Sequence, residues 1–210
     1  QEIESTLAKL ASENNELQIQ RQKLIDENAL IQQQVRQTRA EKEDLQRVID
    51  EQNDLQSIQK KYEFTDEYLK ILKKFKRLII IDTCTLMNHQ EIFDYISESE
   101  AIRIPKIVRE ELDRHKQHYQ FDNERGRKAQ KAIVALKNAK FDSEGIIGRY
   151  CEEDSCIELI PSDYDSDNPD NRILSVAIRY ARYSDVEVIL VSGDENCYGR
   201  AFGEDRIIGL

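Results

Sequence analysis

The chain has 210 residues, of which 34% are charged and 39% hydrophobic, and its formal net charge at pH 7 is -10. This length holds one domain plus an extension, and so large a charged share indicates a long solvated helix. The acidic balance repels nucleic acid as a whole, so nucleic-acid binding would require a local basic patch or bound cations.

Cysteine usage and hydropathy indicate the compartment. The four cysteines are too sparse and irregular for a disulfide framework, which favours a reducing, intracellular and specifically cytoplasmic location. No apolar run approaches the ~20 residues of a membrane span, and no signal-peptide pattern opens the chain. We therefore expect no membrane partner. The first residue is Gln rather than Met, which suggests a fragment of a longer protein.

Residues 1–60 have the composition of a coiled coil. They contain no Gly, no Pro and no aromatic residue, and an unbroken heptad repeat runs through them. Asn14 and Asn28 fall at a positions, where paired Asn side chains satisfy each other in a parallel two-stranded coil. The d positions are Ile3, Leu10, Leu17, Leu24, Ile31, Thr38, Leu45 and Gln52. We expect a homodimer; the alternative is a single long helix that packs on its own domain or on a different protein.

The pattern changes towards the C-terminus. A connecting helix is expected within residues 61–77, with Thr65 as its N-cap. From residue 78, short apolar runs alternate with amphipathic segments, which indicates strands at 78–81, 101–104, 157–160, 186–191 and 206–210 and helices at 106–117, 123–138 and 170–183. This order predicts an α/β domain over residues 78–210, a three-layer α/β/α arrangement with a mostly parallel central sheet.

Two acidic residues follow the strongest strands. Asp82 comes directly after the strand at 78–81, and Asp194 follows the strand at 186–191. In open parallel sheets, ligands bind beyond the carboxyl ends of the strands, so these two carboxylates are candidates for one site. The alternative for each is that it only caps the next helix.

Two further acidic residues fall on the apolar faces of predicted helices. Glu111 lies within the inward arc of its helix, and Asp170 lies within that of the helix at 170–183, whereas Asn171 and Arg172 fall outside it. Acidic side chains rarely face inward without compensation. Asp82, Glu111, Asp170 and Asp194 would therefore share one or two Mg²⁺ or Mn²⁺ ions, and a pair of ions can clamp the attacking and leaving oxygens of a phosphodiester displacement.

Four short strings in this order resemble the motifs of the PIN domain family: IIIDTCTLMN (79–88), IPKIVREELDRHK (104–116), PDNRILSVAIRYA (169–181) and VILVSGDENC (188–197). The resemblance spans residues 78 to 210 and leaves out the coiled coil. It implies a metal-dependent endoribonuclease with the same four acidic residues as ligands. It also implies supporting roles for Ser192 and Asn196. Asn171 stands where many relatives carry a second Asp.

A basic segment is the second functional indication. Arg125, Arg127, Lys128 and Lys131 form a local positive excess in the acidic chain, and they could hold RNA phosphates beside the acidic cluster. The alternative is a solvated amphipathic helix with its apolar side chains inward, and both descriptions can hold together.

Three functions are compatible with these patterns. The first is an endoribonuclease that hydrolyses single-stranded or structured RNA by a two-metal mechanism, with a protein partner or inhibitor as a further possibility. The second is a catalytically inactive scaffold assembled through the coiled coil. The third is a DNA-directed nuclease of related fold. The intact acidic set favours the first.

The heptad generates a prediction about assembly. The full chain should sediment as a dimer, because paired Asn14 and Asn28 side chains fix a parallel register, whereas residues 61–210 alone should be monomeric. Sedimentation equilibrium on the two proteins measures this. A full chain that stays monomeric at tens of micromolar would contradict it.

Overall fold

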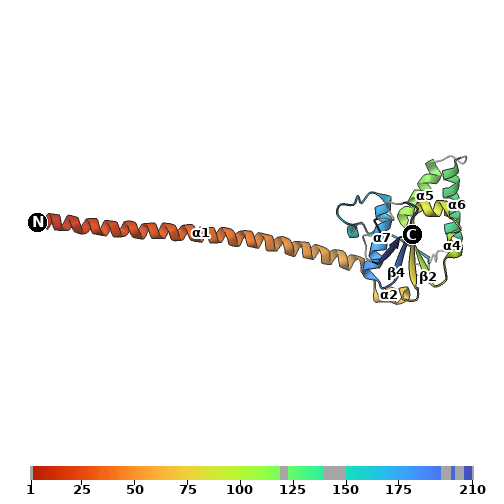
Figure 1. Cartoon of the computed structure of the whole chain (residues 1–210), viewed down its shortest axis with the longest axis horizontal. Helices are drawn as coiled ribbons and strands as arrows, with labels where there is room; N and C mark the ends of the chain where they lie inside the picture. The colour runs from red at the N-terminus through yellow and green to blue at the C-terminus, as the bar shows by residue number, and fades with distance from the viewer. Residues whose placement is uncertain (1, 119–122, 140–149, 195–199, 202–205, 210) are drawn as a thin grey trace. The chain divides into compact units, whose positions relative to one another are not determined.

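A computed structural model describes residues 2–118, 123–139, 150–194, 200–201 and 206–209. The chain divides into two compact units, residues 1–57 and residues 58–210. Helix α1 (Glu2–Tyr62) makes up the first unit and supplies the first residues of the second (Figure 1). Over the described residues, no helix combines the length and apolar character needed to cross a bilayer.

The heptad side chains of helix α1 are exposed to solvent. Leu17 and Leu24, at d positions, are 63% and 60% exposed. Polar contacts along the helix are local, such as the ion pair between Arg39 Nε and Glu43 Oε1 at 3.2 Å, and pairs of this kind contribute only a few tenths of a kcal/mol. Most helical stability in proteins comes from packing an apolar face, so pairing through this face remains our prediction.

The second unit is an α/β domain with a five-stranded sheet in the order β3-β2-β1-β4-β5, all neighbours parallel. Helix α7 lies on one side of the strands and helices α4 and α6 lie on the other (Figure 1), which confirms the predicted α/β architecture. The elements in chain order are α2 (Asp66–Leu72), β1 (Arg77–Ile81), α3 (Thr83–Asn88), α4 (Ile92–Tyr95), β2 (Glu100–Pro105), α5 (Lys106–His118), α6 (Glu124–Asn138), β3 (Tyr150–Glu153), the 3-10 turn η1 (Ile157–Leu159), α7 (Pro169–Tyr183), β4 (Glu187–Val191) and β5 (Ile207–Gly209).

Strand β1 is the centre of the sheet. Its last four residues, 78–81, are all buried, as a strand covered on both faces requires, and this explains its continuous apolar run. It pairs with β2 on one side and with β4 on the other, where Ile81 lies opposite Val191. The ends of β1 and β4 therefore lie side by side.

The prediction of a strand at residues 157–160 is wrong. Residues Ile157–Leu159 form a 3-10 turn, and the edge strand is Tyr150–Glu153. The backbone N–H of Cys156 donates to Ser175 Oγ at 2.8 Å, which ties this segment to α7 instead of the sheet. Strand β3 contains acidic residues that form ion pairs with arginines on neighbouring elements. Hydropathy alone does not reveal such pairing.

A buried arginine organises one side of the sheet. Arg103 on β2 is fully buried; its Nε donates to Tyr180 Oη at 2.9 Å and lies 3.6 Å from Glu153 Oε1. Tyr68 Oη donates to the same carboxylate oxygen of Glu153 at 3.1 Å. Because a buried charge is tolerated only when it is paired and hydrogen-bonded, this network fixes α2, β2, β3 and α7 relative to one another.

The segment before α2 packs into the same network. The Phe64 ring stacks on Tyr68 with centroids 4.6 Å apart, and the Arg179 guanidinium lies 4.2 Å from the Phe64 centroid. Arg179 Nε also donates to the carbonyl oxygen of Tyr62 at 3.0 Å. Residues from 58 onward thus belong to the compact domain.

Phe64→Ala should destabilise the domain by about 2–3 kcal/mol, below the usual range for a fully buried Phe because this ring is partly exposed. Urea denaturation followed by tyrosine fluorescence measures it, since residues 1–61 contain no tyrosine. Tyr95→Ala is the matched control, because Tyr95 is 81% exposed and its loss should change stability by less than about 0.5 kcal/mol. Equal losses in the two variants would contradict the anchoring role of Phe64.

Candidate functional site

The site lies where the strand order reverses. The chain passes from β1 outward to β2 and β3, then returns to build β4 and β5 on the other side of β1. Asp82 follows β1, and its N–H donates to the carbonyl oxygen of Val191, the last residue of β4, at 3.1 Å. Open α/β sheets bind ligands at this kind of position, beyond the carboxyl ends of the strands.

Asp82 is both a helix cap and the centre of the site. Its side chain is only 2% exposed. Oδ1 accepts from the Thr85 N–H at 2.6 Å and so caps α3, while Oδ2 accepts from Ser192 Oγ at 2.6 Å. The capping role that the sequence left as an alternative therefore exists, and it orients the carboxylate towards the neighbouring strand end.

Glu111 reaches the site from α5. Its Oε2 accepts from Thr83 Oγ1 at 2.6 Å, in the first residue of α3. Thr83 and Ser192 thus play equivalent parts, each a hydroxyl donating to one acidic side chain. The role of Thr83 as a donor to Glu111 was not predicted, because the contact joins residues that are 28 positions apart.

Asp170 and Asp194 complete the acidic group. Asp170 lies in the first turn of α7, whose N-cap is Asn168. The pKa of Asp170 is raised, first by burial and then by the negative charges of Asp194, Glu111 and Asp82, while Arg200 opposes the shift. The other three predicted acidic residues are therefore within electrostatic reach of Asp170.

Asn171 is placed differently from the helical-wheel expectation. The prediction that it lies outside the buried arc is wrong, since it is 1% exposed. Its Nδ2 donates to the Asp165 carbonyl oxygen at 2.7 Å, and its Oδ1 accepts from Arg200 Nη1. The Arg200 guanidinium also lies 5.2 Å from the Tyr164 ring centroid. A wheel considers only contacts along one helix, whereas the loop before α7 covers this side chain.

Arg200 brings a cation to the acidic group, and the sequence patterns did not identify it. No local pattern marks this residue, because its partners Asn171 and Tyr164 come from α7 and the loop before it. Ser192 lies beside Asp82, and its Oγ also accepts from the Asp194 N–H at 3.1 Å. Asn196 lies outside the described residues.

The donor chemistry of the site fits a hard divalent cation. Carboxylate oxygens predominate, with hydroxyls beside them, and this is the ligand set that Mg²⁺ and Mn²⁺ prefer. Among the residues that the structure describes, no three acidic, His or Cys side chains converge as a ready-made metal cage. Asp82 and Glu111 instead accept hydrogen bonds from Ser192 and Thr83. The pKa of Asp170 is raised first by burial and then by neighbouring negative charges, which a cation would offset.

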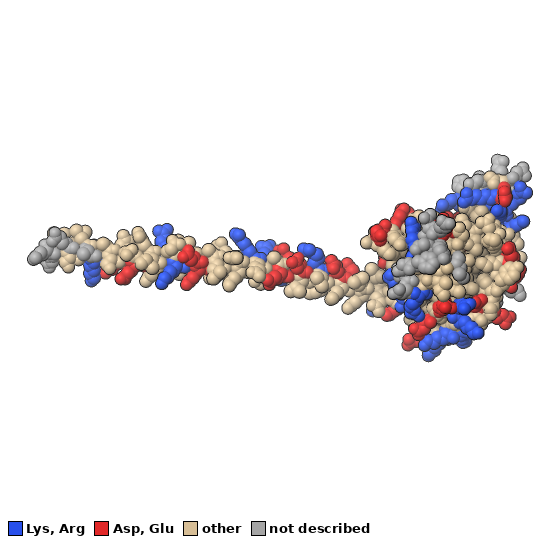
Figure 2. Space-filling view, viewed as in Figure 1, with Lys and Arg blue, Asp and Glu red and all other residues tan. Residues whose placement is uncertain are grey.

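The basic helix α6 is amphipathic and borders the site. Its inward residues include Ala129, Ile133 and Leu136, which are buried. Arg125 and Lys128 line a pocket of about 360 Å³. Arg127 and Lys131 are exposed on the same helix and do not line that pocket. Basic side chains gather where α5 and α6 meet, and a second group lies near α2 (Figure 2).

Comparison with known proteins supplies the family. Residues 79–205, more than half of the chain, match the PIN domain. No curated protein matches the chain. A solved structure described as a domain of a functionally unknown protein from Methanocaldococcus jannaschii DSM 2661 is 20% identical, covers 64% of this chain and 91% of its own, and superposes with a TM-score of 0.42. That likeness carries no functional conclusion.

Asp170→Asn should stabilise the metal-free domain at neutral pH. A raised folded-state pKa means that the ionised carboxylate destabilises the fold, and that this penalty disappears as the pH falls through the raised pKa towards the ordinary value of 3.8. The gain from Asp170→Asn should therefore be largest near about pH 7 and shrink towards about pH 4. Urea denaturation in EDTA measures it. Asp163→Asn, which alters an exposed carboxylate, is the control, and a gain that grows on acidification would contradict the assignment.

Proposed function

Because the chain belongs to the PIN domain family, we propose that it is a metal-dependent endoribonuclease. The observation that supports the proposal is that Asp82 lies at the switch point of the sheet and that, after burial, the charges of Asp194, Glu111 and Asp82 raise the pKa of Asp170. These residues come from four separate segments of the chain. Repulsion between these carboxylates does not stabilise the fold, so a role in binding cations accounts best for their placement.

The chain's own residues have distinct parts in this proposal. The four carboxylates would hold one or two Mg²⁺ or Mn²⁺ ions. Bound there, a cation would activate water as the nucleophile and offset charge on the phosphodiester. Ser192 and Thr83 orient the carboxylates of Asp82 and Glu111 through hydrogen bonds of 2.6 Å. Orientation by neighbouring hydrogen bonds is how metal-binding side chains are commonly prepared.

Arg200 and the basic helix would serve the substrate. Asn171 accepts a hydrogen bond from Arg200 and so holds this cation beside Asp170. The basic side chains of α6 would contact the RNA backbone and steer a polyanion towards an acidic protein. The residues that we assign to this backbone contact are Arg125, Arg127, Lys128 and Lys131.

A dimer formed through the coiled coil would carry two copies of the site. Pairing through residues 1–60 would place two domains on one dimer and raise the effective concentration of the second site once RNA is bound to the first. An inactive scaffold is the second candidate, since α1 exposes an apolar heptad face suited to assembly. A scaffold, however, has no need for four carboxylates that repel one another.

Asp82→Asn should lower RNA cleavage at least ~100-fold, because it removes a ligand charge, without lowering stability. Asn keeps an oxygen that can accept from the Thr85 N–H, so the cap of α3 survives. Asp82→Ala should also abolish cleavage but destabilise the domain by about 1 kcal/mol, since the cap is lost. Cleavage assays on RNA and DNA with Mg²⁺ or Mn²⁺, and thermal melting with and without Mn²⁺, measure these effects.

The controls separate the candidate functions. Mn²⁺ should raise the melting temperature of the wild type and do much less for Asp82→Asn. An Asp82→Asn variant that still cleaves RNA would remove Asp82 from the mechanism. A wild type that cleaves neither RNA nor DNA with either metal would favour the scaffold, and preference for DNA would favour the DNA-directed nuclease.

A further inference from the structure

Arg200 is held in a fixed position beside the acidic group. Its Nη1 donates to Asn171 Oδ1, and its guanidinium lies 5.2 Å from the centroid of the Tyr164 ring. The next residue, Ala201, is fully buried and anchors the backbone of this segment, while Arg200 itself is partly exposed. Contacts with two different segments therefore restrain a side chain that has many rotamers when it is free.

Asn171 is itself locked with its amide oxygen towards Arg200. The side chain is 1% exposed, and its Nδ2 donates to the Asp165 carbonyl oxygen at 2.7 Å. A carbonyl can only accept, so this contact assigns the nitrogen of the amide and leaves the oxygen facing the guanidinium. The oxygen of Asn171 thus binds Arg200 instead of serving as a ligand for a metal ion.

The groups that hold Arg200 do not cancel its charge. One is an amide and the other an aromatic ring, and both are neutral. The positive charge acts on Asp170, whose pKa it lowers against burial and the neighbouring carboxylates. A cation that neutral partners hold beside carboxylates offsets their repulsion, which is the electrostatic service that a metal ion also supplies.

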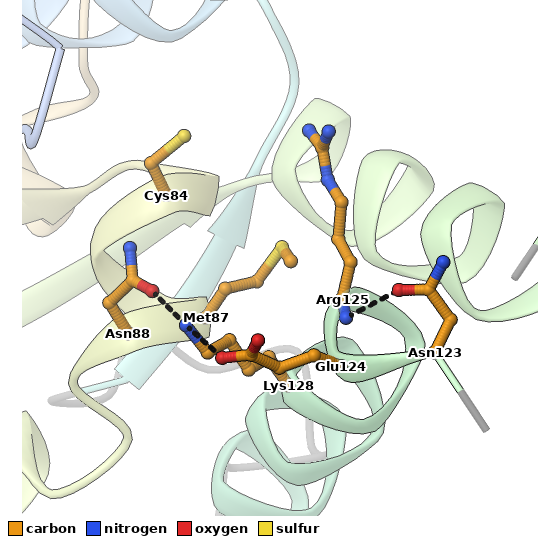
Figure 3. Close-up of a pocket in the computed structure, with 7 residues that line it drawn as sticks. All are labelled: Cys84, Met87, Asn88, Asn123, Glu124, Arg125 and Lys128. Carbon is orange, nitrogen blue, oxygen red and sulfur yellow. Dashed lines mark hydrogen bonds and ion pairs between the residues drawn. The ribbon is translucent and has the colours of Figure 1, made fainter. Parts of the chain in front are cut away.

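The cations of helix α6 are held differently. Lys128 Nζ lies 3.2 Å from Glu124 Oε1 and donates to Asn88 Oδ1 at 3.1 Å (Figure 3). A carboxylate of its own helix therefore shares the charge of Lys128, as in ordinary i, i+4 pairs. Arg200, by contrast, is held by neutral groups and acts electrostatically on the acidic group itself.

A second divalent ion would have to enter beside this guanidinium. In two-metal sites the ions lie roughly 4 Å apart. Asp170 would then have to serve the second ion while Arg200 acts on it, and Asn171 could not assist because its oxygen accepts from Arg200. Two divalent ions together with the guanidinium would exceed the charge of the four carboxylates, whereas one ion with the guanidinium would not. One ion and Arg200 therefore fit the acidic group better than two ions.

We propose that Arg200 takes the place of a second metal ion, so that each domain binds a single divalent cation and the guanidinium contacts the phosphate that is cleaved. This inference rests on the proposed function and decides what that proposal leaves open, the number of ions. A guanidinium stays charged and offers paired N–H donors to phosphate oxygens. Asn171 is a positioning residue, since it acts through Arg200.

The first test measures bound ions without turnover. The electron paramagnetic resonance signal of free Mn²⁺ is followed while the full chain is titrated with this metal. The wild type should bind one Mn²⁺ per chain. Arg200→Gln should bind two, because the loss of the guanidinium leaves negative charge beside Asp170 uncompensated, and Arg200→Lys, which keeps the charge, should bind one. A wild type that binds two ions, or an Arg200→Gln variant that still binds one, would overturn the inference.

Lys74→Gln is the matched control. It removes one positive charge from an exposed position before β1, at the end of this strand opposite to Asp82. This variant should bind one Mn²⁺, like the wild type. A second ion here would show that the number of ions follows the net charge of the chain instead of Arg200, and the inference would fall.

The second test separates positioning from a merely structural role. At Mn²⁺ concentrations that fill only the first site, Arg200→Gln should lower kcat for RNA at least ~100-fold, as loss of a group that stabilises transition-state charge does, with little change in KM. Asn171→Ala should lower kcat less. If Asn171 acts through Arg200, adding Asn171→Ala to Arg200→Gln should cause no further loss. Losses in kcat that multiply in the double variant would remove Asn171 from the positioning role.

The two proposals fail in different ways. If the wild type cleaves RNA but binds two Mn²⁺ ions, the nuclease assignment stands and the inference about Arg200 falls. If the number of bound ions follows Arg200 as stated but no RNA is cleaved, the single-ion site stands and the endoribonuclease proposal falls. A wild type that binds no Mn²⁺ would overturn both.

Discussion

Mutual repulsion of carboxylates at the switch point of the sheet is the constraint around which this domain is organised. Asp82 and Asp194 follow the adjacent strands β1 and β4, and Glu111 and Asp170 approach from helices α5 and α7. Hydroxyl donors to Asp82 and Glu111 compensate part of the charge. Burial and the surrounding negative charges raise the pKa of Asp170, although Arg200 acts in the opposite direction. The remaining repulsion would favour the cation binding that we propose.

The buried cation of Arg103 contrasts with the acidic group, because its charge is paired. Arg103 is fully buried, but Tyr180 and Glu153 surround its guanidinium, and Tyr68 donates to the same Glu153 carboxylate. Removing one member of such a network leaves a buried charge uncompensated. The network joins β2 and α7, and these elements lead to Glu111 and carry Asp170. A paired buried charge thus joins the elements that position Glu111 and Asp170.

Cationic side chains lie next to the acidic group in a chain that is acidic as a whole. Arg200 is held beside Asp170 by Asn171, and Arg125 and Lys128 line the pocket next to Cys84. The basic helix predicted from sequence is also an ordinary amphipathic helix, with Ala129 and its neighbours inward. Both descriptions hold because the apolar and basic residues occupy different faces. The structure further divides the four basic residues into two that line the pocket and two that do not.

The sequence by itself determined the α/β class, the central strands and the positions of the acidic residues at strand ends and helix starts. These features are local: a run of apolar residues marks β1, and Asp82 follows it directly. Tertiary structure alone decided that Tyr150–Glu153 is a strand and Ile157–Leu159 is not, because the acidic strand residues depend on distant arginines. It also decided that Asn171 is buried and holds Arg200, and that Thr83 donates to Glu111. Periodicity reports which face of an element is apolar, whereas the partner that a polar side chain meets depends on how distant segments pack.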